Sequence, residues 1–323
     1  MSPQSAISSA PTRFAEDDAR ANEGFLYGVC YRMTGTHADA QEVVQETFLR
    51  ALERPPLDTT QPWRPWLTRV AVNLCKDRLR RRKTRGYVGP WLPAPVELVA
   101  DNDCELPSAA RYERLESASF AFLLALEHLT PQQRAVLVLR DVLDYSVDET
   151  AAALGITASN VKVTLHRARH ALAAAEAESG SWRARKLSDT AREAQRDMLQ
   201  RFMLALAMGD EAAMRACLAD DVRLHTDGGG EFFAAKKPVE GRDKVMTFLL
   251  RVVRGVLPQR FEIRDLNGAP ALVSEFGPRA DRYAERVVTR IELGPDGLIT
   301  GYDSVLATDK VRHLFDTPSL PGA

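Results

Sequence analysis

The spacing of apolar residues changes at about residue 200, and this change limits the folds open to the chain. Before it, apolar residues recur at helical spacing, as in Val43, Val44 and Phe48, and Gly35 is expected to end the helix that precedes them. After it, a helical stretch (RFMLALAMG, then DEAAMRACLADD, which ends at residue 221) leads into short strand-like runs separated by Gly, Pro and Asp. GPDG at 294–297 lies between two such runs, as a hairpin turn would. Helices followed by a meander predict separate domains, the last of them α+β.

Charge is unevenly distributed, although the formal net charge of the 323 residues is only −1. Residues 76–85 carry seven basic side chains and one acid, whereas 87–127 carry seven acids and two arginines. Such segregation indicates a polyanion or another charged surface as partner. A solvated helix face is the alternative, but seven like charges in ten positions repel one another unless something neutralises them.

Cysteine usage and the N-terminal stretch indicate the compartment. Cys30, Cys75, Cys104 and Cys217 lie far apart and match no metal or redox spacing, which favours reduced thiols in a cytoplasm. The first residues, MSPQSAISSAPT, show neither a basic start nor an apolar stretch, so no signal peptide is expected. We therefore expect a soluble cytoplasmic protein with no membrane partner.

Residues 145–172 carry the pattern of a helix-turn-helix. A short helix is predicted to end at Gly155, and a second helix begins at or near Thr157. Its apolar stripe, spaced 4, 3 and 4, comprises Val161, Leu165, Ala168 and Leu172. No acid occurs from 158 through 175, as a helix facing DNA phosphates requires. An ordinary helical hairpin is the alternative. His166 and His170 have no third metal ligand nearby, so no metal site is expected and phosphate contact is the better interpretation.

A second nucleic-acid element precedes this motif. The predicted helix PWLTRVAVNLCKDRLRRRK places one apolar face at Leu67, Val70, Ala71 and Leu74. Asn73, Asp77 and Arg80 share another face. Trp63 and Trp66 lie beside the Pro-rich loop 54–62, and aromatic side chains next to positive charge suit unstacked bases. Tryptophans on helices are more often core residues, so we expect at least one of the two to be buried.

Three blocks together resemble one family. YRMTGTHADAQEVVQETFLRAL, PWLTRVAVNLCKDRLRRR and LTPQQRAVLVLRDVLDYSVDETAAALGITASNVKVTLHRAR have the order and spacing of bacterial sigma factors of the extracytoplasmic-function type. The resemblance covers 14–86 and 111–175. It implies an alternative sigma factor that directs RNA polymerase core to specific promoters, helps to melt the −10 region, and has no cofactor or active site of its own.

The resemblance implies three sets of contact residues. The first block docks on the clamp helices of the polymerase, here through Glu42, Gln45, Glu46 and Leu49. The second block reads the −10 element, here through Trp66, Asn73, Asp77, Arg80 and Arg81, with loop 54–62 as the pocket for a flipped base. The third block reads the −35 element, here through Ser159, Asn160, Lys162, His166, Arg167 and Arg169. The expected partners are promoter DNA and RNA polymerase core, at its clamp helices and its flap.

Two departures from the family pattern concern these contacts. Val163-Thr164 follows the recognition-helix lysine where the family often has Ser-Arg. Gln41-Glu42 stands where the family usually has an acidic pair. The −35 contacts therefore follow less directly from the resemblance than the −10 contacts.

The C-terminal part resembles a SnoaL-like domain, which is a curved sheet wrapped by helices around an apolar cone. A subgroup of sigma factors with this extension carries WLPEP-, DGGGK- and NPDKL-like motifs, which here read WLPAP (91–95), DGGGE (227–231) and ATDKV (307–311). The resemblance implies that the domain regulates the chain in cis, in place of a separate anti-sigma factor. The residues expected at this interdomain contact are Trp91, Leu92, Pro93, Asp227, Gly228, Gly229, Gly230, Asp309 and Lys310.

Local chemistry leaves alternatives at these motifs. Three glycines after Asp227 allow positive φ or a close backbone approach, although a simple hairpin loop has the same composition. The fold also hosts enzymes, which need a His or Asp pointed into the cone. His225, Asp227 and Asp303 are the candidates, with no orienting partner evident in the sequence. A small ligand in the cone is a further hypothesis.

The expected architecture is multidomain, with two all-α DNA-binding domains followed by an α+β cone. The expected segments are a polymerase and −10 domain at 14–86, a Pro-rich acidic linker at 87–110, a −35 domain at 111–178, a connector at 179–198 and a regulatory domain at 199–317. The second functional hypothesis is a helix-turn-helix regulator with a ligand-sensing C-terminal domain. In the linker, two prolines restrict the docking segment before it binds, which lowers the entropy cost of ordering it.

Overall fold

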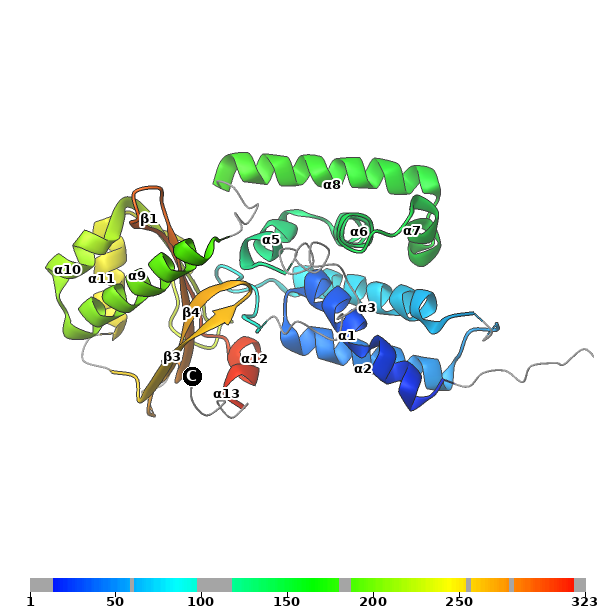
Figure 1. Cartoon of the computed structure of the whole chain (residues 1–323), viewed down its shortest axis with the longest axis horizontal. Helices are drawn as coiled ribbons and strands as arrows, with labels where there is room; N and C mark the ends of the chain where they lie inside the picture. The colour runs from blue at the N-terminus through cyan, green and yellow to red at the C-terminus, as the bar shows by residue number, and fades with distance from the viewer. Residues whose placement is uncertain are drawn as a thin grey trace, which may run out of the picture. The chain divides into compact units, whose positions relative to one another are not determined.

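The computed structural model describes residues 14–58, 61–97, 118–179, 187–253, 257–278 and 282–316, which divide into two compact units (Figure 1). Unit 1 contains the described residues of 14–35, 39–80 and 129–171. Unit 2 contains 36–38 and the described residues of 81–128 and 172–316. The units therefore do not follow sequence order, because the linker belongs with the C-terminal part of the chain.

Unit 1 is built from helices. Its helices, three of which extend into unit 2, are α1 (Glu16–Thr34), α2 (His37–Glu53), α3 (Trp63–Arg85), α6 (Pro131–Leu137), η2 (Val138–Val142), α7 (Val147–Leu154) and α8 (Ala158–Ser179). Gly35 ends α1 in the left-handed conformation, with φ of 72°, which agrees with the predicted break at this residue. The proline-rich loop after α2 contains no regular structure in its described residues, also as predicted.

The buried face of α3 differs from the predicted one. Leu67 and Ala71 are buried as expected, but Val70 and Leu74 are only partly buried. The buried stripe instead continues in steps of four through Cys75 and Leu79. A straight helix has 3.6 residues per turn, so an apolar stripe can follow either three- or four-residue steps, and the basic second half of α3 gave few apolar positions to decide between them.

Within unit 1, α1 and α3 contact the segment that leads into the helix-turn-helix. Arg134 in α6 is only 2% exposed, and its Nη1 donates to the Met33 carbonyl of α1 at 2.8 Å. The Tyr145 hydroxyl donates to Thr68 Oγ1 of α3 at 3.2 Å. Two segments that are far apart in the sequence thus share one helical body.

Unit 2 is α+β, as predicted for the C-terminal part. Its helices, apart from the ends of α2, α3 and α8, are α5 (Phe120–Ala125), η1 (Leu126–His128), α9 (Asp189–Met208), α10 (Glu211–Cys217), α11 (Arg242–Val253), α12 (Thr308–Val311) and α13 (His313–Asp316). Its strands are β1 (Leu218–Asp227), β2 (Val239–Glu240), β3 (Arg260–Leu266), β4 (Ala269–Glu275), β5 (Arg286–Leu293) and β6 (Ile299–Val305).

The six strands form one mixed sheet in the order β2-β1-β6-β5-β4-β3, with β1 and β6 parallel and the other neighbours antiparallel. The GPDG turn does join β5 to β6, as predicted. Two details differ from the sequence reading. The stretch 218–221 begins β1 rather than ending a helix, and β2 was not foreseen because it has only two residues. The expected boundary between 198 and 199 falls inside the continuous helix α9.

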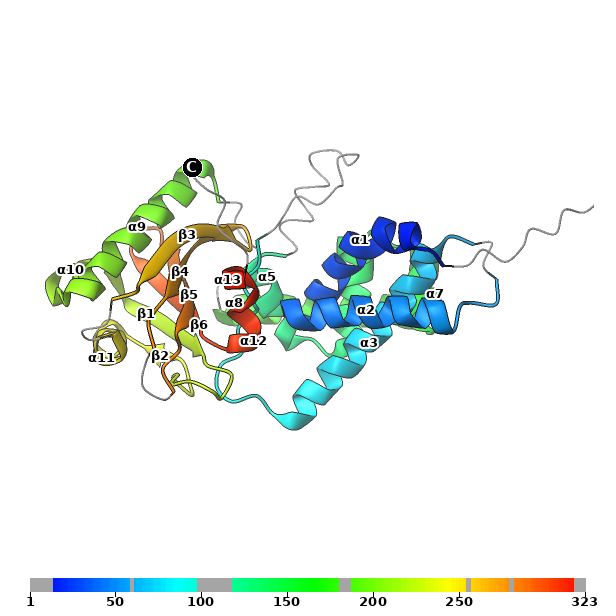
Figure 2. The same ribbon diagram turned by 90° about the horizontal axis from the view of Figure 1, so that it is seen from below.

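Helices lie on both faces of the sheet (Figure 2), and each face carries its own apolar core. On one face α9, α10 and α11 cover a core of Leu199, Phe202, Leu206, Met214, Val222, Leu224, Val245, Met246, Leu249, Leu272, Ile291, Ile299 and Tyr302, among others. The opposite face is covered by α12, α13, α5 and the linker, with a core of Leu92, Phe120, Leu266, Ala271, Val273, Val288, Val305, Val311 and Leu314. Adjacent strand residues point to opposite faces, so β4, β5 and β6 supply residues to both cores.

No helix in the described ranges is long and apolar enough to cross a membrane.

Candidate functional site

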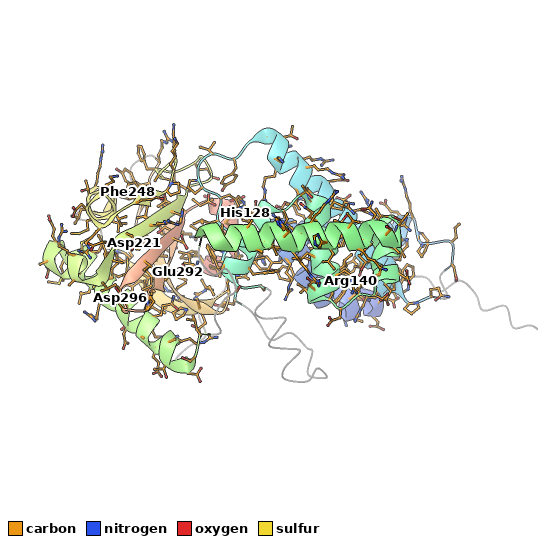
Figure 3. The ribbon with its side chains drawn as sticks, turned by 90° about the horizontal axis from the view of Figure 1, so that it is seen from above. His128, Arg140, Asp221, Phe248, Glu292 and Asp296 are labelled. Carbon is orange, nitrogen blue, oxygen red and sulfur yellow. The ribbon has the colours of Figure 1, made fainter. Side chains whose placement is uncertain are left out.

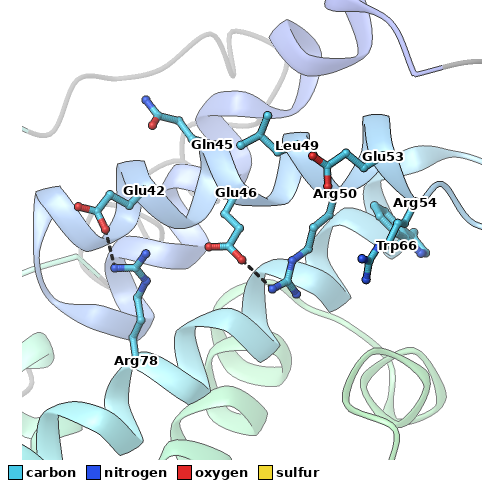
Figure 4. Close-up of a pocket in the computed structure, with 9 residues that line it drawn as sticks. All are labelled: Glu42, Gln45, Glu46, Leu49, Arg50, Glu53, Arg54, Trp66 and Arg78. Carbon is cyan, nitrogen blue, oxygen red and sulfur yellow. Dashed lines mark hydrogen bonds and ion pairs between the residues drawn. The ribbon is translucent and has the colours of Figure 1, made fainter.

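The four residues expected to dock on the polymerase lie together on α2. Glu42, Gln45 and Leu49 are exposed and Glu46 is partly exposed. With Arg78 of α3 and residues at the end of α2 they line a surface hollow of about 750 Å³ (Figure 4). The charges on this surface are paired, because Arg78 Nη1 donates to Glu42 at 2.7 Å and Arg50 Nη2 donates to Glu46 at 2.6 Å. The exposed surface that these residues form is therefore largely neutral and partly apolar.

The expected −10 residues lie along α3. Asn73 is partly exposed, and Asp77 and Arg80 are exposed and joined by an ion pair of 3.0 Å. Arg81 is exposed as well.

The two tryptophans at the start of α3 differ in exposure. Trp63 is 7% exposed and packs edge-on against Phe14, with ring centroids 5.0 Å apart. This confirms that at least one of the two is a core residue. Trp66 is partly exposed, and its ring meets that of Trp63 at 80°. Together with Pro56, Asp58, Gln61, Pro62 and Pro65, both tryptophans line a second hollow of about 330 Å³ beside the proline-rich loop.

The basic run that ends α3 is not uniformly available to DNA. Within unit 2, Arg82 makes a bidentate ion pair with Glu127 of η1, at 2.7 and 2.6 Å. Its guanidinium carbon also lies 4.3 Å from the centre of the Trp91 ring. The clustering of basic residues alone suggested a phosphate contact for this arginine. In the structure its guanidinium instead contacts Glu127 and Trp91 of the same chain.

The helix-turn-helix has the predicted geometry. Ser146 and Glu149 form a capping box at the start of α7, and Gly155 ends it with φ of 64°. Val161, Ala168 and Leu172 of α8 are buried, while Leu165 is half-buried.

All six residues expected at the −35 element are exposed on α8. Two of them also make contacts within the chain. The Asn160 amide oxygen accepts from Thr164 Oγ1 at 2.9 Å, and Arg169 makes a bidentate ion pair with Asp141 at 2.9 and 2.8 Å. Ser159, Lys162, His166 and Arg167 form the remaining polar surface.

The linker docks on the C-terminal sheet through a buried ion pair. Lys310 of α12 is 1% exposed, and its ammonium donates to Asp227 Oδ2 at 2.6 Å and to the Leu92 carbonyl at 2.7 Å. The same carboxylate oxygen accepts the Leu92 amide at 2.8 Å. One Lys–Asp pair therefore binds both polar groups of the Leu92 backbone, and the structure brings residues of all three expected motifs together.

Aromatic residues of the linker surround this ion pair. The Tyr87 hydroxyl donates to Asp227 Oδ1 at 2.5 Å. Lys310 Nζ lies 4.6 Å from the Tyr87 ring centre and 4.5 Å from the Trp91 ring centre. Burial raises the pKa of the Tyr87 phenol and nearby Asp227 raises it further, whereas burial lowers the pKa of Lys310 against the opposing effect of Asp227. Pro93 is buried beside Leu92, and Asp309 is exposed.

The three glycines after Asp227 show both features that glycine permits. Gly229 and Gly230 have φ of 59° and 82°, and the Gly229 amide donates to Asp227 Oδ1 at 3.1 Å. A Cβ on Gly228 would lie 2.9 Å from the Phe232 carbonyl oxygen, and one on Gly229 would lie 2.9 Å from the Ala307 Cβ. This turn is packed against the residue that precedes α12, so it is more than an exposed hairpin loop.

The candidate catalytic residues lie outside the cone. Leu224 and Tyr302 point into the core under α9–α11, so the next residues, His225 and Asp303, point to the opposite face. There His225 Nδ1 lies 2.9 Å from Asp303 Oδ1, and Arg290 Nη1 donates to Asp303 Oδ2 at 2.9 Å. His225 thus has an orienting partner, which was not evident in the sequence because it lies 78 positions away.

Several contact residues were missed by the sequence reading. Tyr87 of the linker binds Asp227, Glu127 binds Arg82 at the end of α3, and Asn267 binds Val96 of the linker. None of the three belongs to a recognised motif. Only Asn267 carried a local signal, because Asn-Gly between two strand-like runs marks a tight hairpin. The acids Asp101, Asp103 and Glu105 and the thiol of Cys104 lie outside the described residues.

Three family models match the chain. They are sigma-70 region 2 at residues 19–85, sigma-70 region 4 at 119–172 and the SnoaL-like domain at 199–302. They correspond to the first helices, the helix-turn-helix segment and the C-terminal sheet with its helices.

Relatives of known assignment agree with these matches. The chain is 36% identical over 265 residues to the ECF RNA polymerase sigma factor SigJ of Mycobacterium tuberculosis, covering 80% of each sequence. It is 30% identical over 154 residues to the ECF RNA polymerase sigma factor SigW of Bacillus subtilis, covering 46% of this chain and 80% of that one. The crystal structure of M. tuberculosis SigJ matches with a TM-score of 0.64 at 29% identity, covering 92% of this chain and 98% of that one.

Proposed function

Because this chain belongs to the extracytoplasmic-function RNA polymerase sigma factors, we propose that its SnoaL-like domain regulates its promoter-directing activity in cis through the linker. Sigma factors bind RNA polymerase core and promoter DNA and are not enzymes, so the chain supplies recognition while the polymerase supplies the chemistry. We infer that it works in the cytoplasm, with the polymerase. The observation that carries the regulatory proposal is the buried Lys310 ammonium, which joins Asp227 to the Leu92 carbonyl.

The α2 surface is proposed as the site for the polymerase clamp helices. Its exposed apolar residues support this, because Leu49 and Leu52 are 56% and 53% exposed on the same helix as Gln45. The internal pairs of Glu42 and Glu46 remove charge that would otherwise have to be desolvated on docking. The polymerase flap is the proposed partner of the −35 domain.

The −10 site is proposed along α3 and its preceding loop. A base that leaves the duplex needs a pocket with aromatic or apolar walls, and the 330 Å³ hollow lined by prolines and two tryptophans supplies one. Asn73, Asp77 and Arg80 lie further along the same helix with exposed polar groups. Arg80 and Arg81 would hold the phosphate backbone, which fixes register without reading sequence.

The −35 site is proposed on α8. Its first turn presents Ser159, Asn160 and Lys162, the part of a recognition helix that reaches base edges. His166 and Arg167 lie one turn further and suit phosphates. Arg169 would have to leave Asp141, or share it, in order to bind DNA.

Regulation in cis is proposed because the docked linker is bound by Lys310 and Asp227, and separating it from them costs free energy. Lys310 and Asp227 are 2% and 0% exposed in their side chains, and removing one partner of such a pair typically costs about 3–5 kcal/mol. The linker completes the pair's hydrogen bonds, so its release would leave buried polar groups unsatisfied. A domain that binds the linker this firmly does the work for which other chains would need a separate anti-sigma factor.

We do not propose an enzyme in the C-terminal domain. Catalysis in this fold would use a cone lined with polar groups, but the described side chains under α9–α11 form a closely packed apolar core. His225, Asp227 and Asp303 lie on the face that the linker covers. For the same reason a ligand-sensing regulator is the weaker hypothesis.

In vitro transcription with core polymerase tests the regulatory proposal. Lys310→Met leaves Asp227 as an unpaired buried carboxylate, so we expect release of the linker and a promoter output changed at least about threefold. Trp91→Ala removes the indole ring that Arg82 and Lys310 both contact, so it should change the output in the same direction. Two variants serve as controls. Trp91→Phe retains a ring, and Lys310→Met combined with Asp227→Asn removes the unpaired charge, so both should lie closer to wild type.

The same assay can contradict the proposal. If Lys310→Met and Trp91→Ala remain folded by circular dichroism and give the wild-type output, the linker contact is structural and does not regulate.

A further inference from the structure

Asn267 lies in the turn between β3 and β4 and has a left-handed backbone conformation. Its φ is 50°, a left-handed value that asparagine tolerates better than most residues, and Gly268 follows with φ of 80°. The residue is 3% exposed, so its side-chain amide is removed from solvent. A buried amide of this kind must find its hydrogen-bond partners within the protein.

Those partners are backbone groups of Val96 in the linker and of Ala118, which lies just before α5. The Asn267 backbone N–H donates to the Val96 carbonyl at 2.9 Å, and the Val96 backbone N–H donates to Asn267 Oδ1 at 3.1 Å. On its other side, Asn267 Nδ2 donates to the Ala118 carbonyl at 2.9 Å. Val96 and Ala118 are 22 positions apart in the sequence, yet a single side chain holds both.

Ala118 lies just before α5, so fixing its position also fixes the start of the proposed −35 segment. Ser119 follows and caps α5, because its Oγ accepts the Phe122 amide at 3.3 Å. The Phe120 ring then lies 4.3 Å from the guanidinium carbon of partly buried Arg290 in β5. Phe120 also shares an apolar core with Leu92 of the linker. The first helix after the linker is thus fixed on the same domain as the last residues before it.

We infer that Asn267 is a positioning residue that sets how far the −10 and −35 readers of this chain can separate, and so restricts the promoter spacer lengths it accepts. The inference rests on the proposed function, because it assumes that the domain acts through the linker. It assigns the role to a residue outside the three motifs.

The reach of the chain explains the size of the expected effect. Released from Asn267 and from the neighbouring contacts of Leu92 and Phe120, the 22 positions between Val96 and Ala118 could span roughly 75 Å when extended. One base pair of spacer changes the separation of the two elements by only about 3.4 Å. A chain clasped at both ends therefore discriminates between neighbouring spacer lengths, whereas an unclasped chain has enough slack to accept several.

Two substitutions at Asn267 of the full-length protein separate the two arms of the clasp. Asn267→Asp keeps the acceptor for the Val96 amide but removes the donor to the Ala118 carbonyl. Asn267→Gly removes both while tolerating the left-handed backbone. Asp296→Gly is the matched control, because Asp296 (labelled in Figure 3) caps another turn of the same sheet by accepting the Leu298 amide at 3.1 Å.

Hydrogen exchange measures the clasp and transcription measures its consequence. We expect Asn267→Asp to lose amide protection mainly in peptides covering 118–125, and Asn267→Gly to lose it there and in 92–97. On promoters whose spacer is one or two base pairs longer or shorter than the best one, we expect the output of both variants, relative to the best spacer, to rise at least about threefold. Asp296→Gly should match wild type in both assays.

Each contrary outcome has a distinct meaning. Unchanged protection in Asn267→Gly would overturn the clasp itself, whatever the transcription result. Lost protection with the same spacer preference as wild type would overturn the specificity role. Failure of the regulatory proposal would instead show as unchanged output in Lys310→Met and Trp91→Ala, which leave Asn267 intact.

Discussion

At the scale of single residues, His225 is the titratable group with the best-defined surroundings. Its imidazole is 27% exposed and is held by Asp303, which Arg290 also binds. The hydrogen bond to Asp303 raises the pKa of His225 above its usual 6.5, burial acts in the opposite direction, and nearby Glu292 (labelled in Figure 3) raises it further. The protonated form is therefore favoured in the folded chain.

This raised pKa predicts how stability depends on pH. A histidine whose pKa is higher in the folded state stabilises fully below about pH 6.5, and that contribution is lost as pH rises through the folded pKa. We therefore expect the free energy of unfolding of wild type, relative to His225→Gln, to fall as pH rises from about 6.5 through the folded pKa. Urea unfolding at several pH values measures this difference. A difference between the two proteins that stays constant with pH, or that grows as pH rises, would contradict the prediction.

At the scale of elements, the end of α3 is tied to η1 by the Arg82–Glu127 pair. Both side chains are about one quarter exposed, at 23% and 27%, and the contact is bidentate. The pair joins the last turns of α3, the proposed −10 helix, to the first turns of the proposed −35 segment. Arg82 also stacks on Trp91, so the same side chain contacts the linker.

Charge reversal tests this connection. We expect Arg82→Glu and Glu127→Arg each to lower the free energy of unfolding by about 1 kcal/mol, because each places like charges together. The double reversal restores the ion pair but not the cation–π contact with Trp91, so about half of the summed loss should return. Urea unfolding of the four proteins gives the coupling energy. Strictly additive losses would show that the two side chains do not interact in solution.

The same elements show how far the sequence could predict the structure. Local patterns were sufficient for Gly35, Gly155 and the GPDG turn, because a helix end or a tight turn is specified by neighbouring residues. The contact between the linker motif and the two C-terminal motifs followed from resemblance, and the structure brings these residues together at Lys310 and Asp227.

Other parts of the candidate site could not be predicted in this way. Arg82 with Glu127, and His225 with Asp303, are 45 and 78 positions apart, and such long-range pairs leave no periodic signal. The face of the sheet on which His225 lies depends on strand register, which the short runs did not specify.

At the scale of the whole molecule, unit 1 holds together two regions that promoter recognition has to separate. The −10 and −35 elements are about 25 base pairs apart by their names, which is roughly 85 Å along DNA. In unit 1, however, Arg134 of α6 donates to the Met33 carbonyl of α1, and Tyr145 reaches Thr68 of α3. We expect these contacts to break when both elements are bound, and therefore to oppose holoenzyme formation.

Removing the buried arginine should therefore favour the polymerase-bound state. Arg134→Leu deletes the hydrogen bond to Met33 and leaves a buried carbonyl unsatisfied, a cost of about 1–3 kcal/mol to the packed form. If the packed form predominates without polymerase, a loss of about 1.4 kcal/mol raises the affinity for core polymerase about tenfold. Fluorescence titration of labelled protein with core polymerase measures that affinity. A matched variant, Arg192→Leu, removes a partly exposed arginine of α9 and should leave the affinity unchanged. An Arg134→Leu protein that is less stable yet binds polymerase no more tightly than wild type would show that unit 1 does not open on binding.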